Sequence, residues 1–226
     1  MINTFKTPLV IYLLLFICFT SLGFIHYFHL DFYFADLIYL KHQSWIYKDH
    51  WFANTVMHSY TKKVIILFFL IYIVKVFIDN KRSSNSISIY PKLVLIISIL
   101  LGTIAVSVLK SSIESDCPWD LIRYGGDKVF FSLFNYDVAS LPSNKCFPAA
   151  HASMGFTFIS VFFYCHLFLN KYKYQALFAS LSLGFTLGFF QQLRGAHFIS
   201  HDIWSLFVCI TVTILIYNLA FRPVSL

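Results

Sequence analysis

Three short polar segments interrupt an otherwise apolar chain, and their basic side chains could act on a phosphate group. The first segment starts at Lys110 and includes Cys117, the second contains His151, and the third contains Arg194 and His197. Ionisable residues at the borders of apolar spans are costly unless they form pairs or carry out a function. The residue types therefore mark a candidate site that combines cationic groups with two imidazoles.

Hydrolysis of a phosphate ester needs cationic and N–H donors around the non-bridging oxygens, together with a nucleophile and an acid. Lys110 and Arg194 could bind the oxygens, and a guanidinium suits bidentate contact. Of His151 and His197, one imidazole could attack while neutral and the other could protonate the leaving oxygen. This chemistry requires no metal and no cofactor.

Two further residues have alternative interpretations. Arg123 is either another phosphate ligand or the partner of an acid in its own loop, and Ser153 either donates to phosphate or caps a helix. His197 and His201 could also form a zinc pair on one helical face. Phe198 stands where a zinc protease has its general-base Glu, and no third ligand lies nearby in the sequence, so a metal site is not favoured.

The elements that must position these residues follow from the composition. The chain has 226 residues, of which 58% are hydrophobic and 12% charged, whereas soluble domains carry about 25% charged residues. Runs of about 20 apolar residues can cross a bilayer as helices. The pattern predicts an all-α fold of one domain, 1–226, a six-transmembrane-helix bundle with two long external loops. The six predicted spans are 8–29, 63–79, 92–110, 147–168, 174–192 and 199–221.

Six spans would place both termini on one side, together with the short connections 80–91 and 169–173. These connections are basic, which predicts a cytoplasmic location for them. The long loops 30–62 and 111–146 would then lie outside, and the three polar segments would meet at that outer face. Aromatic residues and histidines are frequent in 30–62, which is typical of anchoring at the membrane interface. The net charge of +7 suits anionic lipid, and there is no nucleic-acid-binding module.

Two of the five cysteines, Cys117 and Cys146, fall in the same predicted external loop. In an oxidising compartment such a pair could form a disulfide, and the alternative is two unpaired thiols. The other three cysteines lie in apolar spans and are interpreted as packing residues.

The order of the motifs resembles that of the type-2 phosphatidic acid phosphatase and haloperoxidase superfamily. The family pattern is Lys-x6-Arg-Pro, then Pro-Ser-Gly-His, then Ser-Arg-x5-His-x3-Asp. In this chain the similarity runs from Lys110 through Pro148-Ala149-Ala150-His151 to Trp204, within a motif-bearing core of about 92–221. Cys117 replaces the Arg of the first motif. The family Arg of the third motif would fall at Gln191, three residues before Arg194.

The resemblance implies a role for each site residue. His197 would be the nucleophile that accepts the phosphoryl group, and His151 would be the acid. The family's orienting carboxylate would fall at His201, with Asp202 one residue later, so either side chain or a backbone group could orient His197. The resemblance also suggests that a disulfide ties the first motif to the second.

The activity implied by the resemblance is that of a metal-independent membrane phosphatase acting on a lipid phosphate or pyrophosphate through a phosphohistidine. The implied partners are the bilayer and a phosphorylated lipid, with no obligatory protein partner and no nucleic acid. The implied location is the bacterial inner membrane, with the site facing the periplasm. The alternatives are a lipid-linked phosphotransferase and an inactive lipid-binding protein of the same fold.

Overall fold

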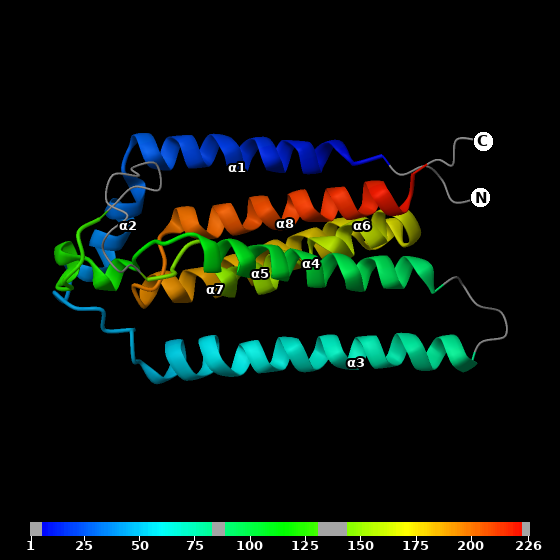
Figure 1. The fold of residues 1–226 in the computed structure, drawn as a ribbon, viewed down its shortest axis with the longest axis horizontal. Helices are drawn as coiled ribbons and strands as arrows, with labels where there is room; N and C mark the ends of the chain where they lie inside the picture. The colour runs from blue at the N-terminus through cyan, green and yellow to red at the C-terminus, as the bar shows by residue number, and fades with distance from the viewer. Residues whose placement is uncertain (1–5, 83–88, 131–143, 223–226) are drawn as a thin grey trace.

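The computed structural model describes residues 6–82, 89–130 and 144–222, and their long helices run side by side along one axis (Figure 1). No strand occurs within these three ranges, which confirms the all-α prediction. The principal elements in chain order are α1 (Leu9–Tyr27), α2 (Leu30–Tyr39), the π-helix η1 (Trp51–Tyr60), α3 (Thr61–Arg82), α4 (Tyr90–Ser112), α5 (Ala150–Phe156), α6 (Ile159–Phe168), α7 (Lys173–Leu193) and α8 (Ile199–Ala220). Short 3₁₀ turns occupy Pro118–Asp120, Ile122–Tyr124 and Asn170–Tyr172.

Within the described ranges, five helical segments are long and apolar enough to cross a membrane. They are Leu9–Tyr27, Tyr90–Ser112, Ala150–Phe168, Asn170–Leu193 and Ile199–Ala220. The span predicted at 63–79 lies in α3, which is not one of the five because each stretch of 18 residues in it contains at least three charged side chains. The integral membrane character is therefore supported, while the count of six spans is not confirmed.

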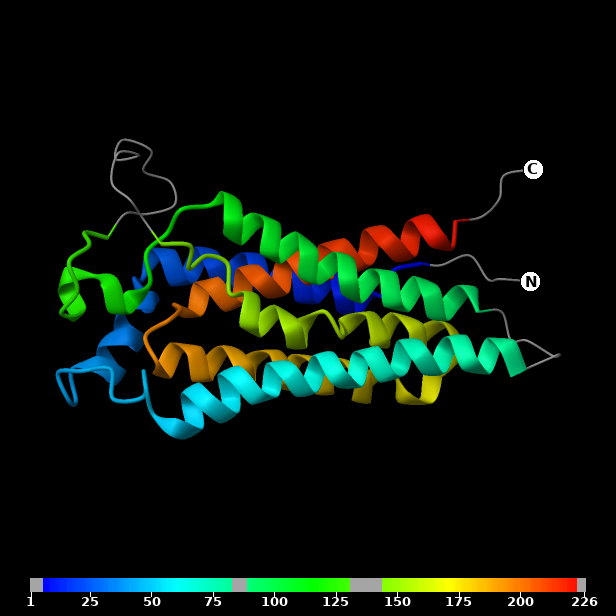
Figure 2. The same ribbon diagram turned by 60° about the horizontal axis from the view of Figure 1, so that its bottom comes forward.

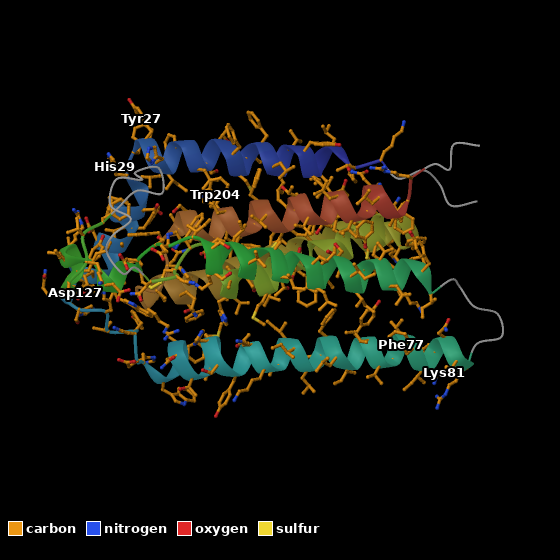
Figure 3. All side chains as sticks on the ribbon, viewed as in Figure 1. Tyr27, His29, Phe77, Lys81, Asp127 and Trp204 are labelled. Carbon is orange, nitrogen blue, oxygen red and sulfur yellow. A yellow bond between two sulfur atoms is a disulfide. The ribbon has the colours of Figure 1, made fainter. Side chains whose placement is uncertain are left out.

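The two ends of the bundle differ in what they carry. Both chain termini lie at one end of the bundle, together with the C-terminal end of α3 and the N-terminal end of α4 (Figures 1 and 2). The opposite end carries α2 and the connection that follows α4. In the side-chain view, His29 and Asp127 lie at this second end and Lys81 at the first (Figure 3). Of the predicted connections, residues 83–88 and 131–143 lie outside the described residues.

Small residues allow the helices to pack closely. Gly155 of α5 faces the backbone of Gly184 on α7, and the Phe156 ring covers Gly184. On α4, Gly102 faces the Thr157 side chain, which follows α5. Membrane helices associate mainly through such backbone approaches, because lipid supplies no hydrophobic driving force between them.

A buried polar network joins three helices in the interior. The Ser160 hydroxyl on α6 lies 2.8 Å from that of Ser98 on α4 and 3.2 Å from that of Thr213 on α8. The Tyr217 hydroxyl donates to the Ser160 carbonyl at 2.9 Å. Hydrogen bonds of this kind between membrane helices fix their register, since the alternative is a polar group left in hydrocarbon.

At the end of the bundle opposite the termini, α2 holds the start of α8. The Asp31 carboxylate accepts a hydrogen bond from the Ser200 N–H at 3.0 Å, in the first turn of α8. Burial raises the pKa of Asp31, and the bond to Ser200 opposes that shift. A carboxylate at this position satisfies an open N–H group and complements the helix dipole.

The contact between α5 and α7 yields a stability prediction. A methyl group at position 155 would meet the Gly184 backbone, so we expect Gly155→Ala to destabilise the protein by about 1–3 kcal/mol, the usual cost of overpacking. Thermal unfolding in detergent would measure the loss. Gly23→Ala is the matched control, because a methyl at Gly23 meets nothing within 4 Å. Equal melting temperatures for the two variants would contradict this description of the contact.

Candidate functional site

The three polar segments meet at the end of the bundle opposite the termini. His151 lies in α5, His201 in α8, and His197 in the connection between α7 and α8. Lys110, in the last turn of α4, is within electrostatic reach of His197 and His201. Arg194, which follows α7, is within reach of His151. The structure therefore brings together basic residues that the sequence separates by more than 80 positions.

His201 contacts both His197 and a backbone carbonyl. The Nδ1 of His201 lies 3.4 Å from the Nδ1 of His197 and 3.1 Å from the Cys146 carbonyl oxygen. A carbonyl oxygen can only accept, so the Nδ1 of His201 carries a hydrogen. His197 either accepts from this N–H through its own Nδ1 or carries a hydrogen on Nδ1 that is directed to the same carbonyl. In the second tautomer the Nε2 of His197 is unprotonated, which is the form that a nucleophile requires.

The surroundings of His197 keep its ring neutral. Burial is the largest effect that holds the pKa of His197 well below its usual value, followed by the nearby His201 and Lys110. The bond to the Cys146 carbonyl opposes this shift. Because the ring stays uncharged at neutral pH, one of its two nitrogens keeps a lone pair that could attack.

Asp202 does not lie beside His197. Its Oδ2 accepts a hydrogen bond from Gln192 at 2.6 Å, and the carboxylate packs against Gly188 of α7. Consecutive residues of a helix are rotated by about 100°, so His201 and Asp202 face different neighbours. Of the two side chains expected to orient His197, the structure brings His201 to it, together with the backbone of Cys146.

His151 is held by a segment that the sequence did not link to the site. Its Nε2 lies 3.0 Å from the Met57 carbonyl oxygen, and its ring centroid lies 4.9 Å from that of His58. Both partners belong to η1. Since Met57 offers an acceptor, Nε2 of His151 carries a hydrogen, and Nδ1 is the nitrogen left to exchange a proton.

Met57 lies close to the change from π-helix to α-helix. At the end of η1, the Thr61 N–H donates to the Val56 carbonyl, five residues back, and α3 begins at Thr61. Irregular helical bonding of this kind is frequent at functional sites. The Met57 carbonyl, one residue after Val56, lies within hydrogen-bond distance of His151.

Arg194 is fixed from two sides. Its Nε donates to the Lys48 carbonyl at 3.1 Å, and its Nη1 donates to Oε1 of Gln191 at 2.9 Å. Residues three apart share a helical face, which explains how Arg194 can stand one turn later than the family position at Gln191. The Nε2 of Gln191 is buried and has no acceptor among the described residues.

Two predicted phosphate ligands have other partners. Arg123 forms an ion pair with Asp36 of α2, with an N–O distance of 2.5 Å, and more than half of its side chain is exposed. The Arg123 hydrogen bond is the main cause that lowers the pKa of Asp36. The hydroxyl of Ser153 donates to the Ala150 carbonyl at 2.8 Å, within its own helix. Neither side chain is brought to His197.

A disulfide joins Cys117 to Cys146, with their Cα atoms 5.3 Å apart. Backbone hydrogen bonds of 2.9 Å reinforce it, from Ser115 N–H to the Asn144 carbonyl and from Cys146 N–H to the Ser115 carbonyl. Asp120 lies close to both sulfurs, but sulfurs in a disulfide are not thiolate ligands for a metal. The disulfide therefore fixes the residue whose carbonyl accepts from His201.

A family comparison agrees with the motif order. The family model described as the PAP2 superfamily matches residues 91–224, which is more than half of the chain. No match was found among curated proteins or among solved structures. Members of this superfamily are generally phosphoester hydrolases. The resemblance seen in the motifs is thus confirmed, and the chain belongs to the PAP2 superfamily.

Proposed function

We propose that this protein is an integral membrane phosphatase that hydrolyses a lipid phosphate or pyrophosphate through a phosphohistidine. The observation that carries the proposal is the pair of imidazoles, His197 and His151, at one end of the bundle. The Nε2 of His151 bonds to the Met57 carbonyl, and the Nδ1 of His197 lies 3.4 Å from the Nδ1 of His201. Lys110 and Arg194 supply the positive charge beside them.

Unused donors support the binding of an anion. The Lys110 ammonium group makes no hydrogen bond or ion pair with any described residue, and the Nε2 of Gln191 is a buried donor without an acceptor. A buried unsatisfied donor costs about 1–3 kcal/mol. A phosphate group, with several acceptor oxygens, would satisfy these donors and offset the positive charge.

The proposed reaction has two steps. Nε2 of His197 attacks phosphorus, the bond from phosphorus to the leaving oxygen breaks, and Nδ1 of His151 donates its proton to that oxygen. In this proposal His197 carries its hydrogen on Nδ1, directed to the Cys146 carbonyl, and this interaction strengthens as positive charge develops on the ring. Water then attacks the phosphohistidine and gives a proton to His151, the N–P bond breaks, and inorganic phosphate leaves.

We further propose that α3 is a sixth span and that the chain forms one domain in a bacterial inner membrane. The short basic connections, with Lys81 at the same end as the termini, support a cytoplasmic location for that end (Figure 3). The site would then face the periplasm, an oxidising compartment in which the disulfide between Cys117 and Cys146 persists.

Replacing the nucleophile tests the proposal directly. We expect His197→Ala to abolish phosphate release from a panel of phospholipid and prenyl phosphates, because the proposed intermediate forms on the imidazole that this substitution removes. The assay contains detergent-purified folded protein and a metal chelator, and His42→Ala, in an exposed loop, is the control. Wild-type-like release by His197→Ala would overturn the mechanism.

Two other results of this assay would change the assignment. Transfer of the phosphoryl group to an added lipid or sugar acceptor in preference to water would indicate a phosphotransferase. Tight binding of lipid phosphate without release or transfer would indicate an inactive lipid-binding protein.

The acid role of His151 predicts a dependence on the leaving group. His151→Ala should lower the rate by about 10²–10⁴-fold for an alkyl phosphate, because the leaving alkoxide needs a proton. The loss should be much smaller for a nitrophenyl phosphate, whose leaving group departs as a stable anion. A loss of equal size for both substrates would show that His151 is not the acid.

The disulfide should affect turnover more than binding. Cys117→Ser releases the Cys146 carbonyl, and a small displacement of reacting groups can cost about 10²-fold in rate. We expect kcat to fall by about tenfold or more while KM changes little, and reductant should do the same to the wild type. Cys165→Ser, at a buried free cysteine in α6, is the control. Unchanged kcat in reduced, folded protein would contradict this role.

A further inference from the structure

A turn that precedes η1 packs against the corner between α7 and α8. The Lys48 N–H donates to the Trp45 carbonyl at 2.9 Å, which closes the turn. A Cβ atom on Gly195 would meet the Trp45 ring, so a residue without a side chain is needed at this point of the corner. The Lys48 carbonyl accepts a hydrogen bond from Nε of Arg194 at 3.1 Å. The turn lies before residues 91–224, so the family match does not include this contact.

The indole of Trp119 brings the side chain of Lys48 to the same corner. The Trp119 N–H donates to the carbonyl of Gly195, directly after Arg194, at 3.0 Å. The Lys48 ammonium group lies 4.7 Å from the centroid of the Trp119 ring, and the Arg194 guanidinium lies 5.9 Å from it. Each such contact contributes about 0.5–2 kcal/mol. One aromatic ring therefore gathers two cations that lie 146 residues apart in the sequence.

The Arg194 guanidinium keeps one nitrogen for a ligand. Its Nε donates to the Lys48 carbonyl and its Nη1 to Gln191, whereas its Nη2 makes no hydrogen bond with any described residue. Within the described ranges, neither Arg194 nor Lys48 forms an ion pair with a carboxylate. Two cations held close together without a counter-charge favour an anion between them, because the anion offsets their repulsion.

The two cations face the site from different depths. Arg194 is buried, stands three residues before His197 and is within electrostatic reach of His151, whereas Lys48 is exposed. An anion bound at the histidines and held by Nη2 of Arg194 would therefore meet the Lys48 ammonium group on its solvent side.

From this arrangement we propose that Lys48 is a further phosphate-binding residue, whose ammonium group, held by the Trp119 ring beside Arg194, contacts the same phosphate group as Nη2 of Arg194. This inference rests on the proposed function. Trp119 is a positioning residue, because it acts on the phosphate only through the two cations. Since Lys48 is exposed, its contribution is a surface charge contact that salt screens.

The test follows hydrolysis of farnesyl monophosphate by the full chain in detergent at two salt concentrations. We expect Lys48→Met to lower kcat/KM by about three- to fivefold at about 0.01 M salt, as the loss of one exposed charge contact would. The loss should nearly disappear at about 1 M salt, where the Debye length is only about 3 Å. Lys48→Arg should stay close to the wild type, because it keeps the charge and the contact with the ring.

The control separates the charge of Lys48 from the structure of its turn. Methionine keeps most of the side-chain stem, and the carbonyl that fixes Arg194 belongs to the main chain, so the turn should stay in place. Lys41→Met makes the same change of charge at an exposed residue that follows α2. Equal kcat/KM values for Lys48→Met and Lys41→Met at low salt would overturn the inference. A loss of the same size at both salt concentrations would also overturn it, since that pattern marks a structural role.

A double-mutant cycle tests the place given to Trp119. If the ring holds the ammonium group in position, Lys48→Met should lower kcat/KM less in a Trp119→Leu protein than in the wild type. Thermal unfolding in detergent would establish that each variant is folded. Losses that simply add in folded protein would show that Trp119 does not position Lys48.

A binding measurement separates this inference from the proposed reaction. Calorimetry with orthophosphate needs no turnover. If no ester is hydrolysed but orthophosphate binds, and Lys48→Met weakens that binding relative to Lys41→Met, the Lys48 contact stands and the hydrolase proposal fails. If turnover is normal and Lys48→Met matches Lys41→Met in both kcat/KM and orthophosphate binding, the hydrolase proposal stands and the Lys48 contact fails. The absence of both hydrolysis and binding would overturn both.

Discussion

The cluster of His197, His201 and the Cys146 carbonyl is the constraint on which the rest of the site depends. A superfamily enzyme would place a carboxylate four residues after the nucleophile, where this chain has His201. The His201 Nδ1–H donates to the Cys146 carbonyl, and the same nitrogen contacts the Nδ1 of His197, so a neutral group stands beside His197 in place of a buried charge. The Cys117–Cys146 disulfide helps to determine where that carbonyl lies, and in the proposed mechanism it therefore supports the nucleophile.

The bundle positions both imidazoles by closing around backbone groups. Gly155 and Gly184 let α5, which carries His151, approach α7, and Asp31 of α2 holds the first turn of α8. On the other side, the π-helix η1 supplies the Met57 carbonyl to His151. His151 and His201 are therefore each held through a main-chain oxygen, which needs precise helix packing but no carboxylate beside either ring.

Much of this was predictable from the sequence, and what was missed has a physical reason. Hydropathy predicts the all-α membrane fold, and motif spacing proposes Lys110, His151 and His197 as site residues, which the structure brings to one end of the bundle. Both signals are local properties of the chain. The directions in which the His201 and Asp202 side chains point depend on where α8 begins. Asp36, the partner of Arg123, lies 87 residues away in the sequence. The contribution of η1 was missed because a π-helix has no simple periodic signature, so 30–62 suggested only an interfacial anchor. The charged side chains of α3 are the reason that the sixth predicted span is not confirmed.

The most direct test of the central claim is to trap the intermediate. Wild-type protein, mixed with a labelled lipid phosphate and quenched under alkaline conditions, would be digested and its phosphopeptides sequenced by mass spectrometry. The proposed mechanism predicts an acid-labile phosphoryl group on Nε2 of His197 that forms and decays at the rate of turnover. Phosphate release with the label on another residue, or with no phosphorylated histidine at any time, would contradict it.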